Sequence, residues 1–156
     1  AERGLLAVHE VDAFTSKDLQ TIMVDLSVLE SRSPNRYRFS LAHELAHVVL
    51  HKDVYAQIHF STLAEWKRVV VSLSERDRGS LEWQAYSFAG LVLVPREPLE
   101  KKLKMAVQRA VKGGLNLKSN HEIAKAYVCT WLGRQFEVSS QVIEKRLDAD
   151  ELWPPR

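Results

Sequence analysis

Two histidines and a glutamate form the arrangement of residues in this sequence that is best suited to chemistry. They stand in the run His43-Glu44-Leu45-Ala46-His47. On an α-helix, a spacing of four residues places both imidazoles on one face, about 6 Å apart along the axis, where two ring nitrogens can converge on one tetrahedral zinc ion. Glu44 directly follows the first histidine, so its carboxylate lies beside the metal and can take a proton from an activated water. The pattern predicts a hydrolytic zinc site with Glu44 as the general base.

A catalytic zinc site needs a third protein ligand and an open fourth position. A third histidine six residues after His47 is excluded, because Asp53 stands there. His51 continues the series, but three successive turns of a straight helix do not easily converge on one ion, so we expect it to hydrogen bond to a ligand. Glu82 is the better candidate, because Ala85 and Ala89 on its helix face allow a close approach to the histidine helix.

Other interpretations of these residues stay open at this point. The two histidines could be hydrogen-bonded core residues beside an unrelated glutamate. Glu82 could serve only to complement the dipole at a helix N-terminus, and Glu65, Glu75 and Asp77 compete with it by charge. Each alternative leaves the site without a defined ligand set.

Peptide cleavage also requires a group that stabilises the tetrahedral oxyanion. Tyr55, His59, Tyr86 and His121 have suitable side chains, and the sequence does not choose among them. Tyr86 has a second possible role in packing.

Hydrophobic periodicity and breaker residues predict the elements that position this site. We expect strands at 5–11 and 21–25, a turn at 31–35, a charged loop at 74–80, and helices at 37–51, 62–73, 81–94, from Pro98 to 112, 120–136 and 139–147. The helix at 37–51 is apolar nearly all round, which predicts burial. Ser80 is the expected N-cap of the helix at 81–94. The fold class is α+β, a small sheet followed by helices.

Composition limits the class of protein. The chain has 156 residues, 46% of them hydrophobic, which suffices for a buried core. Its net charge of +2 does not favour nucleic acid as the main partner. No stretch resembles a signal peptide or a membrane span, so a cytoplasmic protein is expected. Cys129 lies in an apolar run and is expected in the core. A linker at Gly113-Gly114 divides the predicted zinc peptidase domain, 1–112, from a C-terminal helical segment, 113–156.

Two blocks of this sequence resemble the ImmA/IrrE metallopeptidase family. The first is Arg38-Phe39-Ser40-Leu41-Ala42-His43-Glu44-Leu45-Ala46-His47, ending in His51. The second is Glu82-Trp83-Gln84-Ala85-Tyr86-Ser87-Phe88-Ala89-Gly90-Leu91-Val92-Leu93-Val94-Pro95. A weaker similarity follows in Phe136-Glu137-Val138-Ser139 and Arg146-Leu147. The resemblance extends over residues 21–147; Tyr86 departs from it, because the family usually has asparagine there.

The resemblance implies a thermolysin-like zinc peptidase core with one zinc per chain. His43, His47 and Glu82 would be the ligands, and Glu44 the base. The substrate would lie extended along an edge strand, for which Thr21, Ile22, Met23, Val24 and Asp25 are the natural candidates. The implied substrates are helix-turn-helix transcriptional repressors encoded nearby, in mobile elements and in stress responses.

Two other functions remain to be considered. A related protein could bind metal for regulation or sensing without peptidase activity, although its usual mark, loss of the glutamate base, is missing here. A DNA-binding regulator would rest on residues 120–147, where Arg134, Lys145 and Arg146 are diluted by Glu137 and Glu144. The sequence makes no prediction of oligomeric state.

Overall fold

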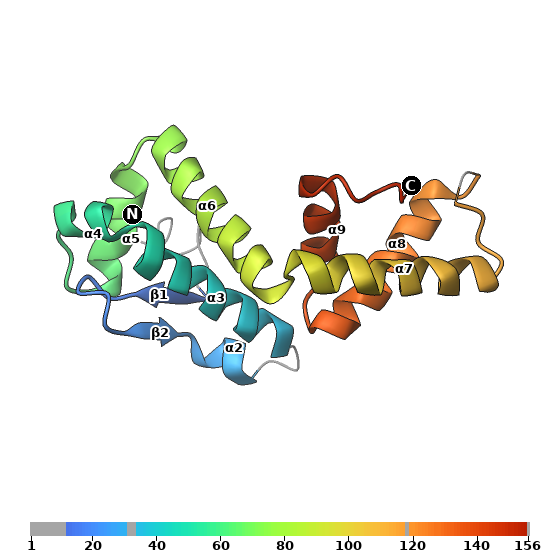
Figure 1. The fold of residues 1–156 in the computed structure, drawn as a ribbon. Coiled ribbons are helices and arrows are strands. Elements are labelled where there is room, and N and C mark those ends of the chain that lie inside the picture. The colour runs from blue at the N-terminus through green and yellow to red at the C-terminus, as the bar shows by residue number, and fades with distance from the viewer. Residues whose placement is uncertain (1–11, 31–33, 118, 156) are drawn as a thin grey trace, which may run out of the picture. The chain divides into compact units, whose positions relative to one another are not determined.

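The computed structural model describes residues 12–30, 34–117 and 119–155. Within these ranges the chain is mostly helical and has a two-stranded antiparallel sheet, which confirms the predicted α+β class (Figure 1). The elements are β1 (Ala13–Thr15), β2 (Ile22–Val24), α2 (Leu26–Glu30), α3 (Pro34–Leu50), α4 (Lys52–Gln57), α5 (Leu63–Ser72), α6 (Glu75–Leu93), α7 (Arg96–Lys112), α8 (His121–Phe136) and α9 (Ser140–Ala149).

By its internal contacts the chain divides into two compact units, Ala1–Tyr86 and Ser87–Arg156. The predicted domain boundary at 112/113 stays a prediction. None of the helices described is long and apolar enough to cross a membrane.

The sheet of the first unit is a hairpin of β1 and β2. Phe14 pairs with Met23 at its centre, and the turn is closed around Asp18, which accepts hydrogen bonds from Ser16 Oγ and Gln20 N. β2 confirms the strand predicted over 21–25. β1 was not predicted, because three residues are too few to show an alternating pattern. The strand expected at 5–11 lies outside the described residues.

Helix α3 packs across this sheet and carries both histidines of the motif (Figure 1). It begins at Pro34, within the segment 31–35 that was predicted as a turn, since proline is well tolerated in a first helical turn. The predicted burial on all sides is wrong: Leu45 is 41% exposed and Val49 52% exposed, whereas Ala42, Glu44, Ala46 and His47 are buried. Only one face of α3 belongs to the core.

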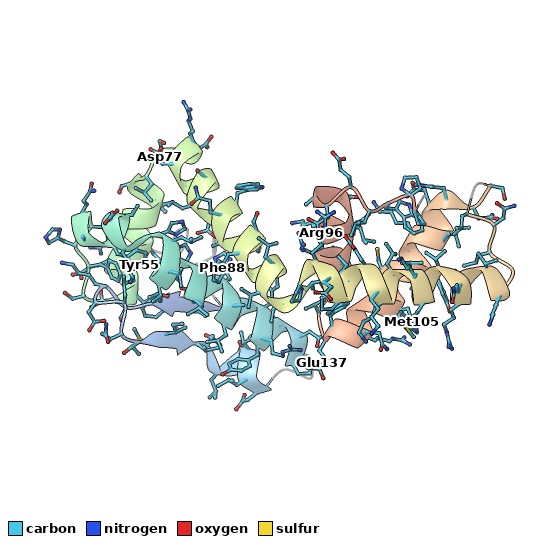
Figure 2. The ribbon with its side chains drawn as sticks, viewed as in Figure 1. Tyr55, Asp77, Phe88, Arg96, Met105 and Glu137 are labelled. Carbon is cyan, nitrogen blue, oxygen red and sulfur yellow. The ribbon has the colours of Figure 1, made fainter. Side chains whose placement is uncertain are left out.

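Helix α6 begins at Glu75 and not at Leu81, so most of the predicted loop at 74–80 is helical. Ser74 provides the reason. Its Oγ accepts a hydrogen bond from Asp77 N and donates one to Asp77 Oδ2, as a helix N-cap does. Figure 2 shows Asp77 in the first turn of this helix. Glu82 therefore lies about two turns inside α6, away from the N-terminal dipole.

The second unit has a continuous apolar core formed largely by α7, α8 and α9. Its buried members are Val94, Leu99, Leu103, Ala106, Ala110, Val128, Cys129, Leu132, Val138, Ile143 and Leu147. The tight connection after α8 requires two special residues. Glu137, labelled in Figure 2, follows α8 and adopts a left-handed conformation with φ 53°. A Cβ at Gly133 would stand 2.8 Å from the carbonyl oxygen of Val138. As predicted, Cys129 is a core residue.

Candidate metal centre

His43 and His47 bring their imidazoles together on one face of α3. Their Nε2 atoms are 3.4 Å apart, and the ring centroids are separated by 5.1 Å. His47 is buried, at 7% exposure. Burial, followed by the neighbouring His43, lowers the pKa of His47, so its imidazole is neutral, the form that binds a metal.

Glu82 reaches the same point from α6. Its Oε2 lies 3.2 Å from His43 Nε2. Burial raises the pKa of Glu82, but the hydrogen bond from His43 and the nearby imidazoles outweigh burial, and the net pKa is lowered. Ligands at about 2.0 to 2.1 Å from a tetrahedral zinc lie about 3.3 to 3.4 Å from one another. The two spacings at His43 fit that geometry, and two nitrogens with one carboxylate are a normal zinc donor set.

Glu44 points to the sheet side of the same cluster. Its side chain is buried, and its Oε2 accepts a hydrogen bond of 2.8 Å from Thr15 Oγ1 of β1. Burial raises the pKa of Glu44 to about 7, against the lowering effect of Thr15. His43, Glu44 and His47 each offer a ligand atom within 4.8 Å of the others, so this part of the chain can hold a metal ion.

Two residues of this site were not predicted from the sequence. Thr15 contacts Glu44 from a strand that was not predicted, and Gln84 Oε1 lies 3.1 Å from His51 Nε2. Each contact joins residues far apart in the chain, and neither leaves a local signal in the sequence. His51 does hydrogen bond to a predicted ligand, since its Nδ1 lies 2.8 Å from His47 Nδ1.

The aromatic candidates for oxyanion stabilisation fall in different places. Tyr86 stacks on Phe39 and lies edge-on to His43, with ring centroids 4.7 Å apart. Burial raises the pKa of Tyr86, so its phenol stays protonated and can donate. Tyr55 is buried with its ring 6.0 Å from that of His47. Both tyrosines therefore contact a histidine of the motif.

The histidine candidates for the same role have other surroundings. His59 is exposed. His121 belongs to the second unit, where its Nε2 accepts a hydrogen bond from Trp153 Nε1.

The competing acidic residues have structural partners of their own. Glu65 forms a capping box with Thr62 at the start of α5. Asp77 pairs with Ser74, and Glu75 is exposed in the first turn of α6. These contacts leave Glu82 as the acidic residue of α6 that meets a histidine of the motif.

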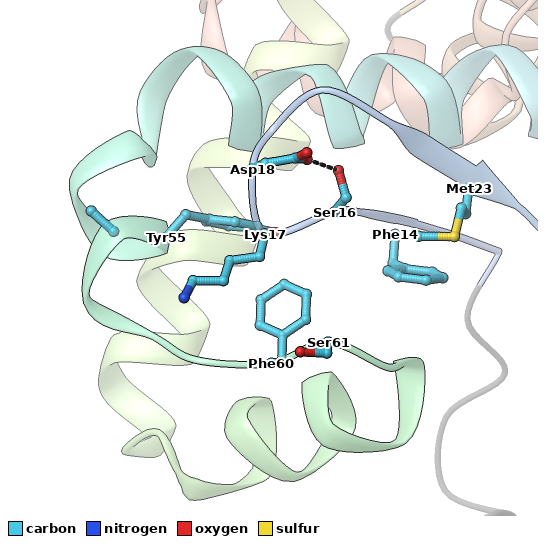
Figure 3. Close-up of a pocket in the computed structure, with 9 residues that line it drawn as sticks. Phe14, Ser16, Lys17, Asp18, Met23, Tyr55, Phe60 and Ser61 are labelled. Atoms are coloured by element: carbon cyan, nitrogen blue, oxygen red, sulfur yellow. Dashed lines mark hydrogen bonds between the residues drawn. The ribbon is translucent and has the colours of Figure 1, made fainter.

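A pocket of about 400 Å³ opens beside the hairpin (Figure 3). Its apolar wall is formed by Phe14, Met23, Tyr55 and Phe60, and Lys17 and Asp18 supply charged groups. Tyr55 contributes to the wall of this pocket and also packs against His47. The pocket is therefore adjacent to a residue that contacts the histidine cluster.

Comparison with known protein families matches residues 17–148 to the IrrE N-terminal-like domain. The match includes the helices that carry the histidines and Glu82. The chain belongs to the IrrE N-terminal-like domain family. This family is one of metallopeptidases, so the resemblance noted in the sequence is confirmed and a bound metal ion is indicated. Searches of curated proteins and of solved structures gave no match.

Proposed function

We propose that this IrrE N-terminal-like domain is a zinc-dependent endopeptidase that holds one zinc with His43, His47 and Glu82. The observation that carries the proposal is the convergence of their side chains: 3.4 Å between the two Nε2 atoms and 3.2 Å between His43 Nε2 and Glu82 Oε2. Both values are close to the edge of a tetrahedral zinc site, about 3.3 to 3.4 Å. The neutral state of His47 and the ionised state of Glu82 suit the same role.

Glu44 is the general base in this proposal and not the third ligand. Its Oε2 is held by Thr15, and its pKa of about 7 suits a group that takes and returns a proton near neutral pH. Zinc, when bound, supplies a Lewis acid that polarises the scissile carbonyl and lowers the pKa of water. Glu44 takes the proton from the attacking water and transfers it to the leaving amine.

A thermolysin-like core is part of the proposal. The supporting features are a small sheet, a histidine helix packed across it, and a second helix that delivers a carboxylate. An extended peptide would lie along β2, where Met23 borders the apolar pocket (Figure 3). By the family resemblance, the substrate class is a helix-turn-helix transcriptional repressor in the cytoplasm.

Metal content and cleavage, measured together, test the proposal. The full chain, Glu44→Gln, Glu82→Ala and the control Glu75→Ala are purified without chelator and analysed by elemental mass spectrometry. We expect about one zinc per chain in the parent, in Glu44→Gln and in the control, and little in Glu82→Ala. Glu75 suits the control because it is an exposed residue of the same helix.

Cleavage is followed with a peptide library prepared from a cell lysate and, separately, with a repressor encoded beside the gene. Glu44→Gln should lose about 10²- to 10⁴-fold in rate while it keeps its zinc. Undiminished cleavage by Glu44→Gln would refute its role as base, and unchanged zinc in Glu82→Ala would remove Glu82 from the ligands. Zinc without cleavage of either substrate by the parent protein would favour a metal-dependent regulator.

A further inference from the structure

A row of three side chains, two buried histidines and a half-buried glutamine, leads away from the proposed metal ligand His47. His47 Nδ1 lies 2.8 Å from His51 Nδ1, and His51 Nε2 lies 3.1 Å from Gln84 Oε1. The histidines are one helical turn apart on α3, whereas Gln84 comes from α6. His51 is only 3% exposed, so water does not readily replace these contacts.

The protons in this row can be assigned from the chemistry of its last member. A carbonyl oxygen only accepts, so Gln84 Oε1 requires a proton on His51 Nε2. An imidazole with a single proton then has a lone pair on Nδ1, and His47 Nδ1 must donate to it. His47, with its own proton on Nδ1, presents a lone pair at Nε2. That nitrogen is the atom 3.4 Å from His43 Nε2.

Which atom of each pair donates its proton depends on the orientation of the Gln84 amide. Its nitrogen donates to Ser80 Oγ at 3.3 Å, one turn earlier in α6, which supports the placement of the oxygen toward His51. The opposite orientation would reverse every donor and put a proton on His47 Nε2, where it would block a metal. Ser80, the expected N-cap, thus lies inside α6 and accepts a hydrogen bond from Gln84.

This row of hydrogen bonds includes His47 but not His43. His43 Nδ1 is buried without a hydrogen-bond partner among the described residues, and its ring is held by packing against Tyr86 and His47. Outer hydrogen bonds to a ligand usually fix its tautomer and ring orientation, and their loss costs about 10- to 100-fold in metal affinity.

We propose that Gln84 and His51 are positioning residues that hold His47 in the tautomer with its Nε2 lone pair toward the metal. The inference rests on the proposed zinc site for its consequence. The hydrogen-bond row itself is a property of the metal-free chain and can be tested separately.

The first measurement is the tautomer of His47 in the metal-free full chain, by two-dimensional ¹⁵N–¹H NMR at mildly alkaline pH, where imidazoles carry one proton. We expect the Nδ1–H form. The variants are His51→Leu, which removes the acceptor, His51→Asn, whose Oδ1 can replace the imidazole Nδ1 as acceptor, and Gln84→Leu. Gln141→Leu, at an exposed glutamine of α9, is the control.

We expect the Nδ1–H form of His47 to persist in His51→Asn and in the control. In His51→Leu and Gln84→Leu we expect it to be lost or to be mixed with the Nε2–H form. The zinc dissociation constant, from competition with a chromophoric chelator, should rise about 10- to 100-fold in His51→Leu and Gln84→Leu and recover in His51→Asn. A merely structural role would not move the tautomer.

An Nε2–H form of His47 in the parent chain would overturn the proposal, whether or not any variant folds. Unchanged tautomer and zinc affinity in both His51→Leu and Gln84→Leu would overturn it as well. Failure of the parent chain to bind zinc would refute the proposed function instead, because the NMR measurement on the metal-free chain would still report on the row.

Discussion

Thr15 of β1 contacts the side chain of Glu44 from the side of the sheet. It is fully buried, and its hydroxyl donates to Glu44 Oε2 at 2.8 Å. A hydrogen bond to a charged group contributes about 1.5 to 3 kcal/mol and also restricts where the carboxylate points. The direction of the proposed base is thus set by a residue of the sheet.

Replacement of Thr15 by valine should therefore slow catalysis without loss of metal. Valine has nearly the same shape as threonine but cannot donate, so Glu44 loses its orientation. We expect kcat to fall about ten-fold, which corresponds to about 1.4 kcal/mol. Steady-state kinetics and zinc content check this, and Thr15→Ser, which keeps the hydroxyl, is the control. An unchanged kcat in Thr15→Val would show that Glu44 is oriented by other contacts.

At the level of single residues, the sequence identified what local spacing encodes. His43, Glu44 and His47 follow from a four-residue periodicity, and Glu82 followed from the small residues on its helix face. Thr15 and Gln84 could not be predicted, because their importance arises only from contacts between distant segments. The roles of all these residues stay predictions until the variants are measured.

At the level of elements, the N-terminus of α6 depends on a single cap. Ser74 exchanges two hydrogen bonds with Asp77 in the first turn, and Glu75 and Asp77 place negative charge at the positive end of the helix dipole. This cap extends the helix well beyond the N-terminus that Ser80 would give it.

Ser74→Ala should destabilise the protein by about 1 kcal/mol, the usual effect of removing a serine N-cap. Chemical denaturation monitored by circular dichroism measures the change in the free energy of unfolding. Zinc content should stay the same, because Glu82 lies about two turns further along the helix. Ser139→Ala removes the serine cap of α9, and its effect on the free energy of unfolding is the reference for that of Ser74→Ala. No loss of stability in Ser74→Ala would mean that α6 does not depend on this cap.

The long helices were predictable because their apolar periodicity extends over several turns. Their ends were less so: Ser74 and Ser80 are both plausible caps, and only the contact with Asp77 distinguishes them. The short strand β1 had no detectable pattern. The burial of α3 was overestimated because apolar composition does not tell which face packs against the sheet.

At the level of the whole molecule, the two compact units differ in the chemistry of their buried residues. The second unit has a continuous apolar cluster. The buried residues of the first unit include Thr15, Glu44, His47 and His51, which belong to the proposed site or contact it. Buried polar groups stabilise less than an apolar core does, so zinc binding should contribute much of the stability of the first unit.

Amide hydrogen exchange of the full chain, with zinc and with chelator, tests this difference. Zinc at about 100 times its dissociation constant stabilises the state that binds it by about 2.7 kcal/mol. Zinc should therefore slow exchange strongly in α3, and leave α8 nearly unchanged. Leu132→Ala, in the apolar cluster, should speed exchange in α8 and leave exchange in α3 nearly unchanged. Equal protection of both helices by zinc would show that the two units unfold as one.

The two imidazoles of the proposed site are restrained in different ways, and this has a consequence for how fast metal is exchanged. His47 Nδ1 lies within hydrogen-bond distance of His51, whereas His43 Nδ1 has no hydrogen-bond partner among the described residues and its ring packs against Tyr86. A chelator removes a metal stepwise, beginning with the ligand that rotates away most easily. We expect that ligand to be His43, so the packing of Tyr86 on its ring would control how long each zinc ion stays bound.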